Sequence, residues 1–354
     1  MTSMAKNLTL HFLTNVPYSN LNRDDAGTPK RVIVGGQLRA LHSSQSIKRG
    51  IRARYEEASL DTSVRSGQLT DEIVRLAYAI RPESDLEALK ERANELVSKL
   101  TSNKGKSANG SDRSVWMSRE EINVATQRVL DEKGGEFIQD DTTGSLAIAA
   151  FGRMFAKKPN KNTEAAIAVS PGVTTHATPI ESDYFTTVDD LKVRDHKTGA
   201  TYLGVQRYVN GTFYRTVTID KEQLKRSWSA FDDPESRDNV RELLRAMVYG
   251  APRGKENSTA PYTMPVLILA EEQRCRTSYE FETPVEPNEG GGFEAPSITA
   301  LSDQYQRARE FDAGNFGDLQ LLSGTAKCPE SEFPGADRVN LHDLIERVVD
   351  WIYA

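Results

Sequence analysis

The segment from His42 to Tyr55, HSSQSIKRGIRARY, contains the residue types that bind an anion. If it winds as a helix at about 100° per residue, four polar side chains gather on one face, and Ile47 and Ile51 lie on the other. The four are Gln45, Lys48, Arg49 and Arg52. Ser43 and Ser44 favour a helix start, where free N–H groups and the positive dipole end attract phosphate. The segment therefore predicts a phosphate-binding helix start.

The same spacing is also typical of a solvated helix face with no ligand. Arg52 and Glu56 stand four residues apart, which allows an ion pair within the helix itself. Spacing alone leaves both interpretations open.

Two pairs of adjacent carboxylates, Asp24–Asp25 and Asp189–Asp190, offer a different chemistry, in which a divalent metal ion activates water. Adjacent side chains point apart in a strand, however, and neither pair has a third ligand at suitable spacing. The five histidines and two cysteines show no zinc spacing, and no phosphate-binding glycine loop is present. We expect no metal, no cofactor and no catalytic residue. The alternative that stays open is a metal-dependent ribonuclease using Asp24 or Asp25.

Positive charge is concentrated near the N-terminus. Residues 1–55 hold nine Lys and Arg against two Asp, a balance of +7, whereas the whole chain carries −6. The other residues therefore carry −13, which predicts a local anion-binding surface on an acidic body. Two cysteines fit a reducing cytoplasm, and no apolar run is long enough to span a membrane. We expect a cytoplasmic protein.

Hydrophobic patterns predict an α+β fold. Helices are expected at 43–55, 71–80, 84–100, 117–132, 233–250, 297–311 and 339–353. Strands are expected at 7–15, 145–155, 164–176, 213–219, 261–271 and 275–283. The segment 179–211 has aromatic and β-branched residues on both sides of a polar tip, which predicts a long projecting hairpin.

Several of these features together are typical of proteins that bind single-stranded RNA. Basic loops at Arg23–Arg31 and Lys157–Lys161 accompany the cationic helix face, and Met154, Tyr184 and Phe185 lie on elements expected to project. Cations follow the phosphates, and flat or soft side chains contact bases. Taken singly, Met154 and Phe185 also fit a hydrophobic core.

Nine short motifs resemble the backbone subunit of the type I-E CRISPR complex Cascade, the CasC family. They are LNRDD at Leu21–Asp25, GG-x-x-R at Gly35–Arg39, SSQSIKR at Ser43–Arg49, GRM at Gly152–Met154, TTH at Thr174–His176, YFTTVDDL at Tyr184–Leu191, YLG at Tyr202–Gly204, GTFYR at Gly211–Arg215 and YTMP at Tyr262–Pro265. Their order and approximate spacing agree over most of the chain. Residues 60–130 and the last fifty or so match weakly.

The resemblance implies an architecture like a right hand. It assigns residues 1–59, 138–178 and 212–354 to a discontinuous RRM-like (ferredoxin-like) palm, 60–137 to a helical fingers insertion, and 179–211 to a β-hairpin thumb.

The resemblance also implies a non-catalytic scaffold that polymerises head to tail along the guide RNA (crRNA). Such a scaffold kinks the guide at regular intervals, so that it can pair with target DNA in antiviral defence. The implied partners are crRNA, target DNA by way of the guide, copies of the chain, and the large, small, 5′-handle-binding and repeat-processing endonuclease subunits of Cascade. Residues implied to contact RNA are Arg23, Lys30, Ser43, Gln45, Lys48, Arg49, Arg52, Met154, Phe185 and Thr186.

One stretch departs from the family. Members carry lysines before the PSI segment, whereas here residues 282–298 read ETPVEPNEGGGFEAPSI. We assign no RNA contact there, and expect the contact to be either missing or replaced, with Lys157, Lys158 or Lys161 as the candidates for a replacement.

Overall fold

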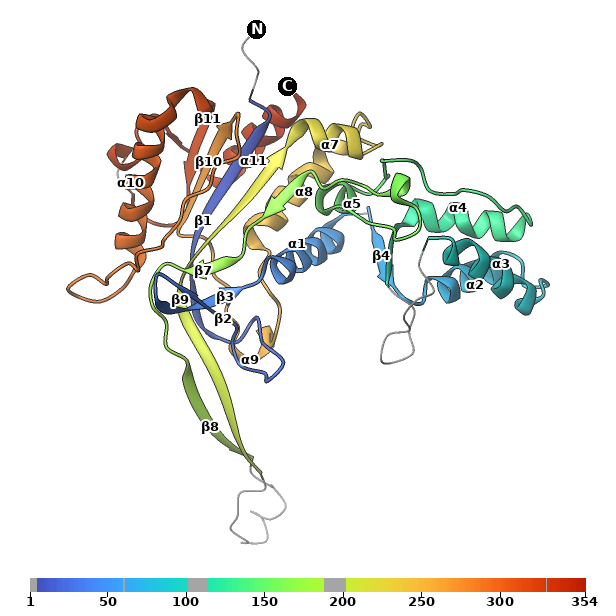
Figure 1. Cartoon of the computed structure of the whole chain (residues 1–354), viewed down its shortest axis with the longest axis horizontal. Coiled ribbons are helices and arrows are strands. Elements are labelled where there is room, and N and C mark those ends of the chain that lie inside the picture. Colours follow the sequence, from blue (N-terminus) through green and yellow to red (C-terminus); the bar gives the residue numbers. More distant parts are fainter. Residues whose placement is uncertain (1–4, 60, 101–113, 188–201, 329) are drawn as a thin grey trace. The chain divides into compact units, whose positions relative to one another are not determined.

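The computed structural model describes residues 5–59, 61–100, 114–187, 202–328 and 330–354. These residues form an α+β fold, as predicted, with a ten-stranded mixed sheet (Figure 1). The chain separates into two compact units. Unit 1 comprises Met1–Ile51, Val169–Thr218 and Met247–Arg347; unit 2 comprises Arg52–Ala168, Ile219–Ala246 and Val348–Ala354. In the described ranges, no helix has the length and apolar character needed to cross a membrane.

The sheet is organised around its long strand β1 (Asn7–Ser19), which extends beyond the expected 7–15. Side chains on both faces of β1 are buried along its first seven residues, so this strand lies between two covering layers. The strand order is β12-β11-β10-β1-β9-β7-β3-β2, with β6 and β8 also paired to β9. The other strands are β2 (Arg31–Val34), β3 (Gln37–His42), β6 (Ile167–Val169), β7 (Gly172–Thr174), β8 (Glu181–Thr187), β9 (Tyr202–Asp220), β10 (Leu267–Gln273), β11 (Phe316–Ser323) and β12 (Asp337–Arg338).

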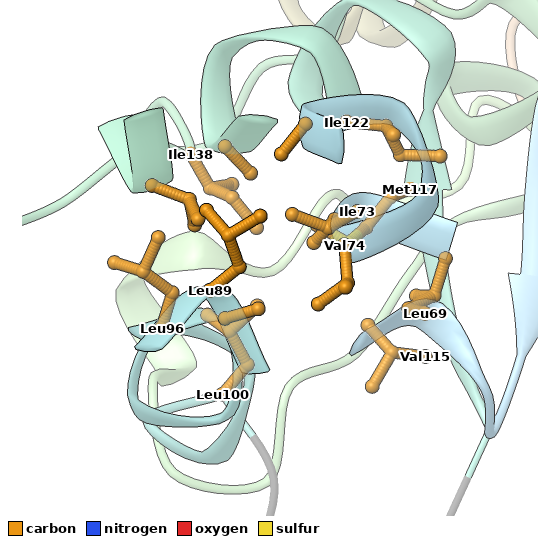
Figure 2. Packing of buried hydrophobic residues seen from close by; sticks show 14 of the residues in the cluster. Leu69, Ile73, Val74, Leu89, Leu96, Leu100, Val115, Met117, Ile122 and Ile138 are labelled. Atoms are coloured by element: carbon orange, nitrogen blue, oxygen red, sulfur yellow. The ribbon is translucent and has the colours of Figure 1, made fainter. Parts of the chain in front are cut away.

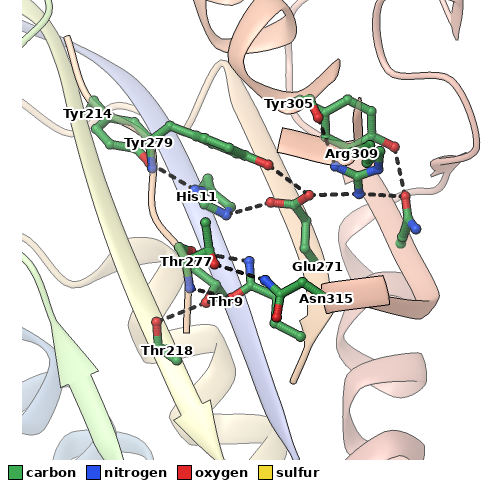
Figure 3. A network of polar contacts seen from close by, with 12 residues as sticks. Thr9, His11, Tyr214, Thr218, Glu271, Thr277, Tyr279, Tyr305, Arg309 and Asn315 are labelled. Atoms are coloured by element: carbon green, nitrogen blue, oxygen red, sulfur yellow. Dashed lines mark hydrogen bonds and ion pairs between the residues drawn. The ribbon is translucent and has the colours of Figure 1, made fainter. Parts of the chain in front are cut away.

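Helix α10 (Glu294–Asp312) is fastened to the sheet of unit 1 by a buried polar network (Figure 3). Glu271 on β10 lies 2.8 Å from His11 on β1 and 2.8 Å from Arg309 on α10. Burial raises the pKa of the Glu271 carboxyl, but the hydrogen bond and charge of His11 and the charge of Arg309 outweigh this and lower it. Because a buried charge is stable only when paired, the network fixes how α10 sits on β1 and β10.

In unit 2, helices α2 (Leu69–Ile80), α3 (Leu86–Ser98) and α4 (Arg119–Leu130) enclose a hydrophobic cluster (Figure 2). The helix expected at 117–132 is confirmed as α4. The hydroxyl of Ser118, its N-cap, and the Glu121 carboxylate form a capping box. A two-stranded sheet of β4 (Ser63–Ser66) and β5 (Val115–Ser118) adds Val115 and Met117 to the same core.

The other helices are α1 (Ser44–Ala58), α5 (Leu146–Phe151), α7 (Lys221–Ser227), α8 (Ser236–Tyr249), α9 (Glu256–Thr259) and α11 (Leu341–Tyr353). Of these, α1, α8 and α11 were predicted, α7 and α9 were not, and α5 was expected to be a strand. The boundary between the two units falls within α1, after Ile51.

The strand predicted at 145–155 is wrong, because the chain forms helix α5 there. Five consecutive residues from Leu146 are buried, three of them alanine. In a short run of consecutive apolar residues, the spacing of apolar and polar residues cannot distinguish a strand from a helix, and the alanines favour the helix. Gly152, at φ +77°, ends it.

Three other strand predictions need correction. No strand forms at 275–283, where the backbone is irregular; Tyr279 and Phe281 are buried there without sheet pairing. The expected strand at 213–219 is part of the 19-residue β9, and 164–176 contains two short strands, β6 and β7. None of β2, β3, β4, β5, β11 and β12 was predicted from the sequence.

The predicted hairpin is confirmed in its two arms, β8 and the first part of β9, which extend away from the sheet of unit 1 (Figure 1). Its tip, 188–201, lies outside the described residues. Phe185 pairs with Gly204 across the hairpin and Thr186 with Leu203, so Phe185 and Thr186 lie on opposite faces.

The core of unit 2 gives a direct stability test on helix α4. Ile122 is fully buried, whereas Val124 on the same helix is 38% exposed. We expect Ile122→Ala to lower the unfolding free energy by about 2–5 kcal/mol, because it leaves a cavity. Val124→Ala, the matched control, should cost about 0.5 kcal/mol or less. Urea unfolding followed by circular dichroism measures both, and equal losses would contradict the assigned core.

Candidate nucleic-acid interface

The loop between β1 and β2 is a tight turn that presents Arg23 and Lys30. Arg23 and Pro29 form an isolated β-bridge, and the Lys30 N–H donates to the Asn22 carbonyl at 2.9 Å. Asp24 closes the turn, since its carboxylate Oδ1 accepts the Thr28 N–H at 2.8 Å. The loop therefore has a fixed shape, with Arg23 exposed and Lys30 half-buried.

This turn is joined to the start of helix α1 by hydrogen bonds. The Ser43 N–H donates to the Asn22 side-chain oxygen at 2.7 Å, and the Leu41 N–H donates to the Lys30 carbonyl at 2.8 Å. The Ser43 hydroxyl accepts the Ser46 N–H at 3.4 Å, as expected for an N-cap. The structure thus brings the loop and the helix start together, as a site for phosphate requires.

Along α1 the predicted division of faces is confirmed. Ile47 and Ile51 are buried, while Gln45 and Arg49 are exposed and Lys48 is half-buried. Among the described residues, no carboxylate pairs with Arg23, Lys30, Lys48 or Arg49. Their charges are therefore not neutralised within unit 1, which leaves them for an external anion.

Arg52 differs from these four cations. It lies beyond the unit boundary, 3.7 Å from the Glu56 carboxylate, and its guanidinium stands over the Trp116 ring at 5.2 Å. The pairing foreseen as the alternative interpretation of α1 is therefore present at this residue. Arg52 is therefore less available to an external anion than Lys48 or Arg49, because its guanidinium already has partners in unit 2.

The lysines of the basic loop at 157–161 all have partners within unit 2. The Lys161 amine lies within ion-pair distance of Glu136 and Asp140, and Lys158 pairs with Glu136. The Lys157 amine donates to the Ser98 carbonyl at 3.1 Å. The expectation that these lysines replace the family's missing lysines gains no support, because each already has an internal partner.

The GG-x-x-R motif has a structural role. Gly35 and Gly36 adopt φ of +56° and +74°, and a Cβ on Gly35 would lie 2.0 Å from the Glu282 carbonyl oxygen. Arg39 is buried and donates to the carbonyls of Thr174 and Glu282, at 3.3 and 2.8 Å, and to others beside them. One of the nine N-terminal cations is thus unavailable to a ligand.

Met154, Phe185 and Thr186, which the resemblance implies to contact RNA, are divided between the two units. Met154, in unit 2, is 82% exposed and so is not a core residue. Phe185, in unit 1, is half-buried against its own hairpin: a Cβ on Gly204 would lie 2.4 Å from the Phe185 ring. Thr186 is exposed on the other face of the hairpin.

Sequence reasoning left Arg31 out of the site. It is the first residue of β2, at the edge of the sheet, and is exposed. The sequence signal that could have included it is its position directly after Lys30, because the first residue of β2 lies next to the loop that carries Lys30.

His42, next to Ser43, is buried and uncharged. Its ring stacks on Phe213 with 4.2 Å between centroids. Burial, reinforced by the positive charge of Arg215, lowers the pKa of His42 to about 3. The positive charge of this surface therefore comes from Lys and Arg alone, and does not depend on His42.

A pH experiment tests this burial. In the unfolded chain His42 takes up a proton near pH 6.5, but in the fold it does so only near pH 3, so stability falls as pH drops between these values. This one group contributes up to about 1.4 kcal/mol per pH unit there. We expect His42→Gln to reduce the slope of the unfolding free energy against pH between pH 6 and pH 4, by an amount that corresponds to nearly one proton. Urea unfolding at a series of pH values measures this slope. An identical slope in both proteins would contradict a buried neutral His42.

Comparisons with known proteins bear on the family and the fold of the chain. A chain of a solved structure titled "CRISPR RNA-guided surveillance complex, pre-nicking" is 25% identical, with a TM-score of 0.81, covering 98% of this chain and 100% of that one. A chain of a second, titled "CRISPR RNA-guided surveillance complex", is 24% identical with a TM-score of 0.64, covering 98% and 99%. No curated protein matches the sequence. The family model Cas_CT1975, described as CT1975-like protein, matches residues 8–351, and the chain therefore belongs to this family, the CasC family of Cascade backbone subunits.

Proposed function

We propose that the chain is a non-catalytic scaffold that binds the guide RNA of a Cascade complex and polymerises head to tail along it. The family assignment supports the scaffold role. The observation that carries the RNA-binding role is a group of four cations that have no carboxylate partner among the residues the structure describes: Arg23, Lys30, Lys48 and Arg49. They lie on a loop and a helix start that hydrogen bonds join. Gln45 and the α1 N-terminus add neutral donors to the same group.

One protomer has too few of these cations for tight binding. Each phosphate contact contributes a modest, salt-dependent term, so affinity must come from repetition along the strand. A heterologous interface between identical chains gives an open filament whose length the RNA sets. The protein then reads backbone and shape, and base pairing reads sequence.

The projecting hairpin is suited to interrupting the bound strand. In this proposal residues 1–59, 138–178 and 212–354 form the RRM-like palm, residues 60–137 with α2, α3 and α4 form the fingers, and the hairpin 179–211 is the thumb. Phe185 and Thr186, on opposite faces of the hairpin, and the exposed Met154 act where the RNA backbone kinks. Interrupting the guide at intervals lets target DNA pair with it without winding around the filament.

The partners follow from this role. They are crRNA, target DNA paired to it, further copies of the chain, and the other Cascade subunits named above. The likeness to chains of two CRISPR RNA-guided surveillance complexes supports an assembly of this kind. The cytoplasm is the compartment we propose for it.

The alternative, a metal-dependent ribonuclease using Asp24 or Asp25, gains no support from the donors present. The Asp24 carboxylate is used within its own turn, by the Thr28 N–H. Among the described residues, no group of three or more His, Cys, Asp or Glu could hold a metal ion. The second pair, Asp189–Asp190, lies outside them.

Charge removal tests the phosphate-binding surface. We expect the double variant Lys48→Ala/Arg49→Ala to bind single-stranded RNA more weakly and to reduce the slope of log affinity against log salt by about 0.7 per cation removed. Fluorescence anisotropy over a salt series measures both. The matched control is Lys157→Ala/Lys158→Ala, which removes equal charge from a loop whose lysines have internal partners. Equal losses in the two variants would contradict the assigned surface.

Polymerisation is tested by the RNA length. We expect native mass spectrometry of the chain, co-expressed with its Cascade partners on guides of stepped length, to show one added protomer per fixed increment of nucleotides. The reason is that each protomer occupies a set length of backbone. A copy number that stays constant as the guide lengthens would rule out a filament whose length the RNA sets.

A further inference from the structure

A side-chain hydrogen bond joins the base of the hairpin to the cation-bearing loop between β1 and β2. Arg207 on β9 donates from its guanidinium to the Thr28 hydroxyl at 2.9 Å. Thr28 is 5% exposed, and 179 residues separate the two partners. The contact therefore links two segments that the backbone alone would leave independent.

Thr28 is also the residue that closes the loop. Its N–H donates to the Asp24 carboxylate at 2.8 Å, and its carbonyl accepts the Asp24 N–H at 2.9 Å. From this turn the connection continues through Asn22 to the Ser43 N–H at the start of α1. A continuous chain of hydrogen bonds and short backbone thus runs from Arg207 to the helix start.

The neighbouring residue holds the opposite face of the same strand. Gln206 accepts from the Lys255 amine at 3.3 Å and from the Tyr208 hydroxyl at 2.6 Å, and the Tyr208 ring packs on Tyr18 with 4.4 Å between centroids. Because consecutive strand residues point to opposite faces, Arg207 and Gln206 hold the strand from both sides. From Gln206 toward the tip of the hairpin, β9 pairs only with β8 among the described strands.

We propose that Arg207 is a positioning residue which, through Thr28, sets the direction of the hairpin relative to the phosphate-binding loop. The proposal rests on the RNA-binding function proposed above. The loop binds a phosphate of the RNA, and the hairpin interrupts the RNA at the kink. The Arg207–Thr28 hydrogen bond therefore fixes the distance along the RNA between the bound phosphate and the kink. Losing it leaves phosphate binding in place and lets the kink position vary.

The test separates these two quantities. Thr28→Val removes the acceptor without changing any charge, and Arg207→Met removes the donor. In complexes of the full chain with guide RNA and its partners, 2′-hydroxyl acylation reports the repeating reactive nucleotides. We expect each variant to lower the contrast of that pattern at least about threefold, while Thr28→Val keeps RNA affinity and its salt slope within about twofold of wild type.

Two controls distinguish positioning from general damage. Thr28→Ser keeps the hydroxyl and should retain the wild-type pattern, whereas a merely structural need for the Thr28 methyl group would reverse the two results, with Thr28→Ser losing contrast and Thr28→Val, which keeps a methyl, retaining it. The double variant Thr28→Val/Arg207→Met should show no more loss of contrast than Arg207→Met alone, because both changes break one contact. If Thr28→Val lowers the unfolding midpoint, Arg207→Met and its rescue by Arg207→Lys decide the question.

Unchanged contrast in Arg207→Met, or losses that add in the double variant, would overturn the positioning role while leaving RNA binding established. A wild-type complex with no repeating pattern would instead overturn the proposed function, and this inference with it.

Discussion

The cation-bearing surface depends on a buried arginine that is not part of it. Arg39 is 1% exposed, and a guanidinium taken out of water must have its hydrogen bonds replaced. The carbonyls that replace them come from two distant segments, at Thr174 and Thr175 and at Phe281 and Glu282. Strand β3 is thereby held between β7 and the irregular segment at 279–285. Helix α1 begins two residues after β3 ends, so its N-terminus takes its direction from this arrangement.

Internal neutralisation divides the cations of the chain into two classes. Lys158, Lys161 and Arg52 lie near carboxylates of unit 2, and their charge there stabilises the unit itself. Lys48 and Arg49 have no such partner among the described residues, so their positive potential extends into solvent. Sequence spacing treats both classes alike. Tertiary structure separates them, and the separation favours α1 and its loop over the 157–161 loop as the place where RNA binds.

How much the sequence could predict depended on how local each determinant was. The amphipathic face of α1 and the capping box at Ser118 were predictable, because residues within one helical turn decide them. Leu146–Phe151 was not, because burial on every side removes the period that separates strand from helix. The irregular segment at 275–283 has strand-like residues, but they are buried by α10 and Arg39 contacts that sequence proximity does not show.

The same limit applies to the candidate site. Lys30, Lys48 and Arg49 were found from charge and spacing, whereas the partners of Lys161 and the Arg207–Thr28 contact were not, since each joins residues about 20 to 179 positions apart. Motif resemblance supplied the family, but it did not show which motif residues are used inside the fold. Arg39 and Gly35 belong to a motif as clear as SSQSIKR, yet they act by packing and hydrogen bonding.

The residues after position 55 carry a net charge of −13, and this negative charge affects RNA binding together with the local cations. A scaffold that is basic over its whole surface would bind any nucleic acid wherever it met it, since phosphate contacts carry no sequence information. The proposed site gathers only four cations without a carboxylate partner among the described residues, on one loop and one helix start, so a single protomer is a weak binder. Many protomers on one strand bind tightly, because each added copy brings its own set of phosphate contacts and a neighbour. The charge distribution therefore favours a filled guide over scattered single copies on other RNA, and this selectivity arises without any base being read.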